Sequence, residues 1–436
     1  MKKIRIFETF AGIGAQHKAF EILKRNNILD YEVVGTSEWD IWANISYNAI
    51  HHNNENIAKE LADIEIEDFL KKFTHSNNSK EPINNKNLSR FSRHTREMLY
   101  SSYKNSKNQG SIVEINGQRL IDEIGEFDLL TYSFPCQDLS VAGSFHGFNQ
   151  GMAKGSGTRS GLLWEVERLL KELNSINKLP KYLLLENVKN MISDKHKNDY
   201  IEWISFLNGI GFNTQTYILN SKDYGIPQSR ERVYALSILR PKNITFEDTY
   251  FSVGKIVSNN KPKDISEILG RKKTMERVLK LNYEDKTIRD EALESIPNRT
   301  PSRERMYFEN RVLFTLRKEK KESCENKFTK IYHKFKNGYF LNYCSTLTTK
   351  QDRNPNAGII DLKNTKLENL KIEEKRKANY RFLTPREAYL MMGFENQDVD
   401  KIYKSGLIRR EVKYRQAGNS IVVNVLLAIF NLIKEV

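Results

Sequence analysis

The chain has 436 residues, enough to bury a large hydrophobic core and to form two domains. Its formal net charge of +15 at pH 7 favours a polyanionic partner such as nucleic acid. Three cysteines without a CxxC spacing argue against a disulfide framework and a zinc site, and we expect no bound metal. We also expect a soluble cytoplasmic protein, because no signal-peptide pattern occurs and no apolar run approaches the roughly 20 residues that span a bilayer.

Short apolar segments alternate with amphipathic ones from residue 3 to about residue 240. This pattern is typical of an α/β domain built on a mainly parallel sheet. A polar stretch over residues 53–110, rich in Asn and Lys, looks weakly helical at best, and we interpret it as an insertion or surface subdomain. The expected strands cover residues 4–7, 31–36, 127–132, 182–186, 213–219 and 232–238.

The periodicity fades beyond residue 240, which predicts a second, smaller domain over residues 241–378. Thr384, Pro385 and Glu387 then predict a helix start, with a capping threonine, a proline in the first turn and a glutamate at the third helical position. Residues 420–434 are expected to form an apolar amphipathic helix. Unlike the helices of the first domain, this helix does not follow an expected strand. We therefore expect residues 379–436 to return to the first domain.

A glycine-containing turn, residues 10–14, follows the first expected strand and opens a helix. Glycine allows close approach of a ligand to the backbone, and the helix start leaves N–H groups free. At the end of the second strand, the Glu38 carboxylate could accept from two ribose hydroxyls and the Trp39 indole could stack on adenine. Because no GxxxxGK[ST] loop occurs, these residues favour a nucleoside cofactor without a triphosphate.

Four further residues carry candidate chemistry. Cys136 follows Pro135 directly after an apolar strand, where a cysteine can react as a thiolate, although buried cysteine is more often a small hydrophobe. Glu186 ends another apolar strand, as a proton donor or as a capping or salt-bridged acid. Arg230 and Arg232 would point to one face of extended backbone, where guanidinium groups bind phosphate or carbonyl oxygen.

Taken together and in this order, the motifs resemble those of the bacterial DNA (cytosine-5) methyltransferases of restriction-modification type. The resemblance implies a Rossmann-like fold that uses S-adenosylmethionine, with a mainly parallel sheet and a smaller target-recognition domain. It implies a catalytic and cofactor-binding domain over residues 1–240, a recognition domain over residues 241–378 and a C-terminal segment over residues 379–436. The motifs are FAGIG at residues 10–14, Glu38-Trp39, Pro135-Cys136-Gln137, Glu186-Asn187-Val188, Gln228-Ser229-Arg230-Glu231-Arg232 and Gly418-Asn419-Ser420.

The resemblance also implies a role for each catalytic residue. Cys136 would add to C6 of a cytosine flipped out of the duplex, so that C5 can take the methyl group. Glu186 would hold or protonate N3 of the base, and Asn187 would help to orient it. Arg232, together with Arg230, would bind the base O2 and help to position the thiolate.

The remaining site residues are also assigned from the resemblance. The acid that contacts the adenine amino group is either Glu114, followed by Ile115, or Asp63, followed by Ile64. We favour Glu114-Ile115, because its spacing before Cys136 is the more usual one. The other cofactor residues would be Phe10, Gly12, Ile13, Gly14, Glu38, Trp39, Pro135, Leu163 and Asn419, and the candidate DNA contacts are Gln137, Ser140, Arg159, Thr348, Lys350 and Arg353.

Two alternatives belong to other functional classes. An RNA cytosine-5 methyltransferase of the same fold would carry a Cys-Phe-Thr signature in the middle region, and no Cys-Phe-Thr occurs in the chain. A catalytically silent DNA-binding regulator would be free to lose Cys136, Glu186 and Arg232, which are all present. We therefore expect a monomeric enzyme acting on double-stranded DNA, without a membrane partner; a cognate restriction endonuclease acting separately remains open.

Overall fold

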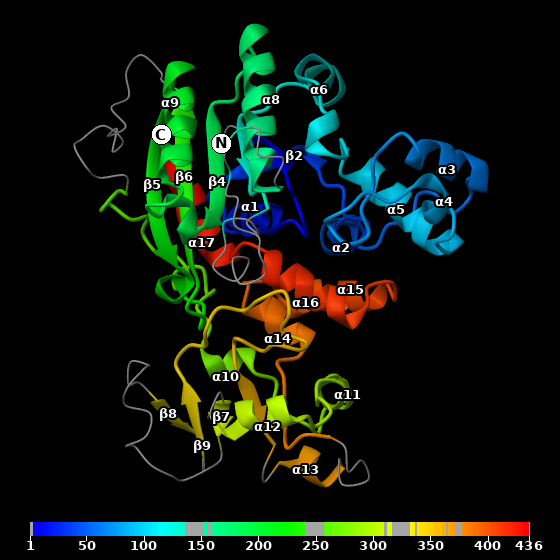
Figure 1. Cartoon of the computed structure of the whole chain (residues 1–436), viewed down its shortest axis with the longest axis vertical. Coiled ribbons are helices and arrows are strands. Elements are labelled where there is room, and N and C mark those ends of the chain that lie inside the picture. The colour runs from blue at the N-terminus through cyan, green and yellow to red at the C-terminus, as the bar shows by residue number, and fades with distance from the viewer. Residues whose placement is uncertain are drawn as a thin grey trace.

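A computed structural model of the chain describes residues 3–135, 139, 152, 154, 159–239, 257–308, 312–315, 332–335, 338–362, 365–370 and 377–435. Within these residues all the expected strands of the first domain form and join one sheet in the order β2-β1-β3-β4-β6-β5 (Figure 1). Strands β2, β1, β3 and β4 pair in parallel, and β6 runs antiparallel to β4 and β5, which confirms the mainly parallel α/β fold. The bounds are β1 (Lys3–Thr9), β2 (Asp30–Ser37), β3 (Leu129–Tyr132), β4 (Tyr182–Val188), β5 (Phe212–Asn220) and β6 (Glu231–Leu239).

Alternate residues of the central strands enter two different cores. Ile6 and Leu129 pack into one cluster, whereas their neighbours Phe7 and Leu130 pack into the other. This alternation follows from the two-residue period of a strand, and it explains why the strands read as unbroken apolar runs in the sequence. The first core is covered by α1 (Ala15–Arg25), α2 (Ile41–His52) and α17 (Val423–Glu435), and the second by α6 (Gly117–Ile124), α8 (Leu163–Ser175) and α9 (Lys197–Gly209).

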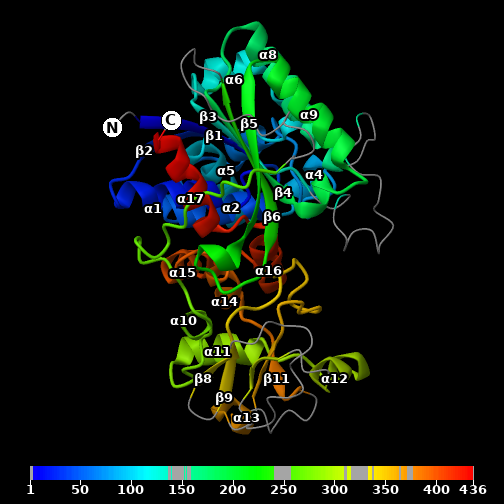
Figure 2. The same cartoon turned by 90° about the vertical axis from the view of Figure 1, so that its left-hand side faces the viewer.

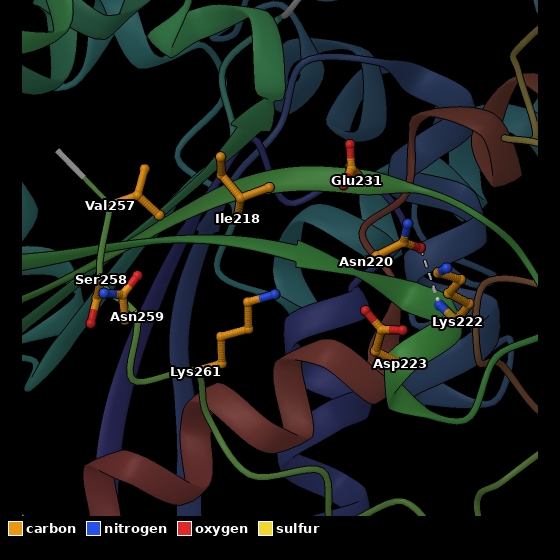
Figure 3. Close-up of a pocket in the computed structure, with 9 residues that line it drawn as sticks. All are labelled: Ile218, Asn220, Lys222, Asp223, Glu231, Val257, Ser258, Asn259 and Lys261. Carbon is orange, nitrogen blue, oxygen red and sulfur yellow. Dashed lines mark hydrogen bonds between the residues drawn. The ribbon is translucent and has the colours of Figure 1, made fainter. Parts of the chain in front are cut away.

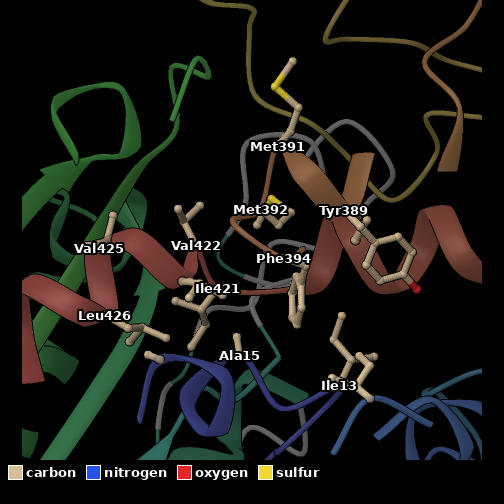
Figure 4. Close-up of a cluster of buried hydrophobic side chains, with 14 of the residues drawn as sticks. Ile13, Ala15, Tyr389, Met391, Met392, Phe394, Ile421, Val422, Val425 and Leu426 are labelled. Atoms are coloured by element: carbon tan, nitrogen blue, oxygen red, sulfur yellow. The ribbon is translucent and has the colours of Figure 1, made fainter. Parts of the chain in front are cut away.

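The C-terminal segment packs against the first helix of the chain. Phe430 of α17 stacks on Phe20 of α1 with the ring centroids 4.0 Å apart. At the start of α17, buried side chains of residues 389–394 and 421–426 form one cluster with Ile13 and Ala15 (Figure 4). The glycine-containing turn therefore packs against the C-terminal segment.

The apolar C-terminal helix follows a polar helix, and the two together form a longer helical stretch. Within the described residues, the segment Arg410–Ile433 contains an 18-residue window whose mean hydropathy of 1.6 would suit a membrane span by length and composition alone. It forms two helices, α16 (Arg410–Asn419) and α17, and 83% of its most apolar window is buried inside the molecule. Its hydrophobicity is therefore explained by packing in the core.

The insertion after α2 is more helical than its composition indicated. It forms α3 (Asp63–Leu70), α4 (Asn85–Leu88) and α5 (Arg93–Asn105), and α5 packs against both α2 and α3. Most of α5 is polar, yet Met98, Leu99 and Tyr103 are buried. Its start is capped by Ser92, whose hydroxyl accepts from the Thr95 amide, so local capping and a few apolar anchors define this helix.

A second body lies below the first in Figures 1 and 2, with α14, α15 and α16 between the two. Its sheet has the strand order β11-β10-β7-β9-β8 in the part of the chain that the structure describes. The predicted helix start at Thr384 is confirmed, because Thr384 and Glu387 cap each other reciprocally at α14. The remaining strands and helices are β7 (Val312–Thr315), β8 (Tyr332–Phe335), β9 (Gly338–Leu341), β10 (Ile359–Asp361), β11 (Tyr380–Arg381), α10 (Met275–Val278), α11 (Lys286–Glu294), α12 (Pro301–Phe308), α13 (Lys366–Leu370), α14 (Pro385–Leu390) and α15 (Asn396–Lys404). Short 3-10 turns are η1 (Ile112–Glu114), η2 (Arg159–Leu162), η3 (Lys189–Ile192) and η4 (Ser221–Tyr224).

Candidate active site

The turn after β1 has an unusual backbone conformation. Phe10, Gly12 and Gly14 all have positive φ, at 52°, 57° and 76°. A positive φ is costly for a residue as bulky as phenylalanine, and such conformations concentrate at functional sites. Among the residues that the structure describes, a Cβ built on Gly12 would have only the Phe10 carbonyl oxygen within 4 Å, at 4.0 Å, so these residues leave space for a ligand beside Gly12. At Gly14 the opposite holds, because a Cβ there would lie 2.2 Å from Nε2 of His51.

Glu38 is joined directly to this turn. Its Oε2 accepts from the Gly12 amide at 2.9 Å, and its Oε1 accepts from the Asp40 amide at 2.8 Å. Burial, together with the nearby Asp40 charge, raises the pKa of Glu38 to about 7. The Asn108 side chain, which we did not predict, bonds both the amide and the carbonyl of Glu38, at 3.1 and 2.9 Å. The carboxylate is thus fixed beside the open face of Gly12, as a ligand for ribose hydroxyls requires.

The other residues expected at the cofactor occupy different environments. Ile13 is buried in the C-terminal cluster of Figure 4, so only its backbone can face a ligand. Leu163 is buried at the start of α8, Trp39 is half-buried after β2 and Asn419 is exposed at the end of α16. The structure therefore gives Ile13 a supporting place beneath the turn.

The two candidate adenine acids lie in clearly different places. Asp63 begins α3 and its carboxylate pairs with Arg93 and with Arg96, the latter at 3.0 Å. Glu114 ends η1, in a segment that pairs with the end of β2 through an isolated bridge between Thr36 and Asn108. Only Glu114 is thus connected to the strand end that carries Glu38.

A second polar cluster lies where β3 and β4 end side by side. The parallel register aligns Tyr132 with Leu185, which brings the next residues, Ser133 and Glu186, together. The Ser133 hydroxyl donates to Oε2 of Glu186 at 2.6 Å, and Nε of Arg232 lies 3.5 Å from Oε1. Glu186 is only 6% exposed, so this carboxylate meets its charged partner away from bulk water.

The loop after β3 is held by neighbouring side chains up to Pro135. The side-chain Nδ2 of Asn187 donates to the Phe134 carbonyl at 3.1 Å, and the Ser160 hydroxyl donates to the Pro135 carbonyl at 2.8 Å. Asn187 is therefore bonded to this loop, and its expected role in orienting the base stays a prediction. The predicted residues Cys136, Gln137 and Ser140 lie outside the described residues, and Arg159 is described only as the backbone start of η2.

Arg230 does not share the environment of Arg232, contrary to our expectation. It is buried, and its guanidinium donates to the carbonyls of Leu347, Gly418 and Ser420, each at 3.0 Å. The reason is local, because β6 begins at Glu231 and the alternation of an extended strand does not reach back to Arg230. Arg230 links three distant segments of the chain, and Arg232 alone faces Glu186.

Residues 346–349, with the sequence Thr-Leu-Thr-Thr, lie beside the segment that carries Arg230. The Leu347 amide donates to Oε1 of Gln228 at 2.9 Å, and the Thr346 hydroxyl donates to the Ser229 carbonyl at 2.7 Å. A Cβ on Gly418 would lie 2.5 Å from the backbone of Thr348, so α16 approaches this motif closely. Lys350 and Arg353 follow at the surface, where Arg353 pairs with Asp352 at 3.1 Å.

A shallow polar cavity of about 400 Å³ lies beside β5, away from the residues described above (Figure 3). Its walls come from β5, η4, the start of β6 and residues 257–261. Strand β5 is the edge of the sheet opposite to β2, so this cavity is separate from the turn and Glu38. We assign it no part in the chemistry.

Two solved methyltransferase structures share this fold. The Dnmt2 methyltransferase of S. pombe matches with a TM-score of 0.52 at 16% identity, over 100% of this chain and 99% of that one. The methyltransferase EhMeth of Entamoeba histolytica matches with a TM-score of 0.53 at 16% identity, over 99% and 97%.

Sequence comparison narrows the class to one family. The family model for the C-5 cytosine-specific DNA methylases matches residues 89–435. The orphan methyltransferase M.SssI of Spiroplasma monobiae is 33% identical over 99% of this chain and 97% of its own length, and the type II methyltransferase M2.ScrFI of Lactococcus lactis subsp. cremoris is 32% identical over 98% of each. The chain belongs to the C-5 cytosine-specific DNA methylase family. It is a DNA (cytosine-5) methyltransferase that uses S-adenosylmethionine, as the motifs predicted.

Proposed function

We propose that the enzyme methylates C5 of a cytosine flipped out of a short double-stranded DNA sequence, through a covalent bond between Cys136 and C6 of the base. The observation that carries this proposal is the cluster of Ser133, Glu186 and Arg232 at the adjoining ends of β3 and β4. The cluster lies at the start of the loop that leads through Pro135 to Cys136. A buried acid and a guanidinium are what a cytosine ring requires beside a nucleophile.

The chemistry follows from the weak nucleophilicity of cytosine C5. Addition of the Cys136 thiolate to C6 makes C5 an enamine-like carbon while negative charge develops on the ring. Glu186 protonates or holds N3, and Arg232 binds O2, so that this charge is neutralised. After methyl transfer, loss of the C5 proton and expulsion of the Cys136 thiolate restore the aromatic ring. A stacked base cannot reach these groups, so the cytosine leaves the duplex at a cost of a few kcal/mol.

The methyl donor supplies an electrophilic methyl group on a sulfonium. We assign its methionine part to the turn of Phe10, Gly12, Ile13 and Gly14, with Ile13 acting through its backbone. Glu38 would accept from the ribose hydroxyls, Trp39 would stack on adenine and Glu114 would accept from the adenine amino group. The open side of Gly12 next to the fixed Glu38 carboxylate supports this assignment. Ile115, Pro135, Leu163 and Asn419 would complete the pocket.

We further propose how the chain is divided and what it contacts. Residues 1–240 form the catalytic domain with the insertion at 53–110, residues 241–378 recognise the target, and residues 379–436 return to the catalytic domain. Double-stranded DNA would lie between the two bodies, touching Gln137, Ser140, Arg159, Thr348, Lys350 and Arg353. We propose a monomeric cytoplasmic enzyme, with any cognate restriction endonuclease acting separately.

Transfer of tritiated methyl groups to duplex DNA tests this function. The Cys136→Ala variant should lose transfer and keep DNA binding. Cys344→Ala is the matched control, because burial raises the pKa of the Cys344 thiol to about 12 and keeps it from reacting as a thiolate. Bisulfite sequencing of DNA from expressing cells would identify the methylated base and its context. Continued transfer by Cys136→Ala, or methylation of RNA in preference to DNA, would contradict the proposal.

A further inference from the structure

We propose that one loop of the insertion, residues 73–79, positions the side chains assigned to the adenine ring, and that Thr74 holds Glu114 ready to accept from the adenine amino group. We call this segment the insertion loop. The inference rests on the proposed cofactor site and adds a role for residues that the family motifs do not include. It makes the insertion part of the cofactor pocket.

The insertion loop first fixes the backbone of Trp39. The Ser76 amide donates to the Trp39 carbonyl at 2.8 Å, and the Ser76 carbonyl accepts from the Ile41 amide at 2.9 Å. These two bonds flank Asp40, whose carboxylate also accepts from the Ser79 hydroxyl at 2.5 Å. The backbone of residues 39–41 is therefore bonded to the insertion loop at both of its ends, and Trp39 is one of those ends.

The same loop also holds the Glu114 carboxylate. The Thr74 hydroxyl donates to Oε1 of Glu114, and the Thr74 amide lies 3.4 Å from Oε2. A carboxylate has about four acceptor positions, so two donors from Thr74 leave others for a ligand. Glu114 belongs to the segment that pairs with the end of β2, where Glu38 lies. One loop thus contacts both residues proposed for adenine.

The insertion loop is itself firmly anchored. His75 is buried, with Nε2 at 2.8 Å from the Leu70 carbonyl and Nδ1 at 3.1 Å from the Tyr103 hydroxyl. Tyr103 belongs to α5 of the insertion, and burial, followed by the nearby charges of Glu38 and Glu114, raises the pKa of its hydroxyl. Beside His75, Phe73 packs on Gly110, where an added Cβ would come within 3.0 Å of its ring. The helices of the insertion therefore hold Thr74 at a fixed position relative to Glu114.

A comparison of two ligands tests the positioning role. S-adenosylhomocysteine and its analogue with hydrogen in place of the adenine amino group would be titrated by calorimetry into the parent and the variants. Thr74→Val removes the hydroxyl donor and keeps the shape, and it should weaken S-adenosylhomocysteine about tenfold, the usual effect of a hydrogen bond to a charged group. It should leave the affinity for the analogue unchanged. Thr74→Ser should restore tight binding.

The control is Ser89→Ala, which removes a hydroxyl bond to another insertion carboxylate, Glu67 at 3.2 Å, and should change neither affinity. Equal weakening of both ligands by Thr74→Val would overturn the inference, because that result indicates a general loss of structure. Unchanged binding in Thr74→Val and Glu114→Gln, with a parent that binds S-adenosylhomocysteine and methylates DNA, would overturn it while the proposed function stands. A parent that binds neither ligand would overturn both.

Discussion

Glu8 is the carboxylate whose replacement should change stability most clearly with pH. It lies on β1, fully buried, and accepts from the Tyr47 hydroxyl at 2.9 Å. Tyr47 in turn lies 2.7 Å from Nδ1 of His17, and burial lowers the pKa of His17 to about 3. The histidine is therefore neutral and offers no positive charge to the carboxylate.

Burial raises the pKa of Glu8 from 4.5 to about 7, and the bonds from Tyr47 and the His17 amide oppose this only in part. A raised pKa means that folding favours the protonated acid. Its contribution to stability is fully present below pH 4.5 and is lost as the pH rises to about 7. The loss corresponds to about 3 kcal/mol when it is complete.

The Glu8→Gln variant should remove this pH dependence, because its amide does not ionise. Urea unfolding of variant and parent would be followed from pH 5 to pH 8, with the exposed Glu32→Gln as the control for loss of a negative charge. Relative to that of the parent, the free energy of unfolding of Glu8→Gln should rise by about 2 to 3 kcal/mol between pH 5 and pH 8, with most of the rise below pH 7. A constant difference between variant and parent would refute the reasoning.

Three further predictions concern buried charges. Burial, and then the Asp40 charge, raise the pKa of Glu38 to about 7, whereas ribose hydroxyls would favour its ionised form. S-adenosylhomocysteine should therefore release a proton from Glu38 on binding and bind about tenfold more weakly for each pH unit below 7. Calorimetry that shows no proton release at pH 6 would contradict this prediction. Arg230→Met should cost about 3 kcal/mol in urea unfolding, because it leaves three carbonyls without their donor, whereas the exposed Arg353→Met should cost less than about 1 kcal/mol. Arg381→Met should lower the free energy of unfolding by about 3 to 5 kcal/mol, because it leaves the buried Glu387 carboxylate without its charged partner. The double variant Arg381→Met/Glu387→Leu should recover part of that stability. If the losses of the two single variants simply add in the double variant, the two residues do not interact directly.

Much of the catalytic fold could be predicted from the sequence because its strands are buried on both faces. Each of them forms within two residues of the expected bounds, and the capping residues at Thr384 mark the start of α14. Helix α5 could not be predicted, because its polar composition hides the few residues that pack on α2. The role of residues 73–79 could not be predicted either, because it depends on contacts with distant residues that no local sequence pattern encodes.

The candidate site was predictable in its residue types and less so in its geometry. Motif order indicated Glu186 and Arg232, and the structure brings them within 3.5 Å of each other. The bond from Ser133 to Glu186 depends on the relative register of β3 and β4, which the sequence does not specify before the strands are paired. Arg230 was misplaced because the strand begins one residue after it.

Trapping on a duplex that carries 5-fluorocytosine tests the central claim most directly. Fluorine cannot leave C5 as a proton does, so the bond between the protein and C6 should persist after methyl transfer. With S-adenosylmethionine present, mass spectrometry should find the modified base attached to Cys136 in the parent. The adduct should be absent in Cys136→Ala and reduced in Glu186→Gln. Methylation of ordinary cytosine without any such adduct, or an adduct on another residue, would contradict the account.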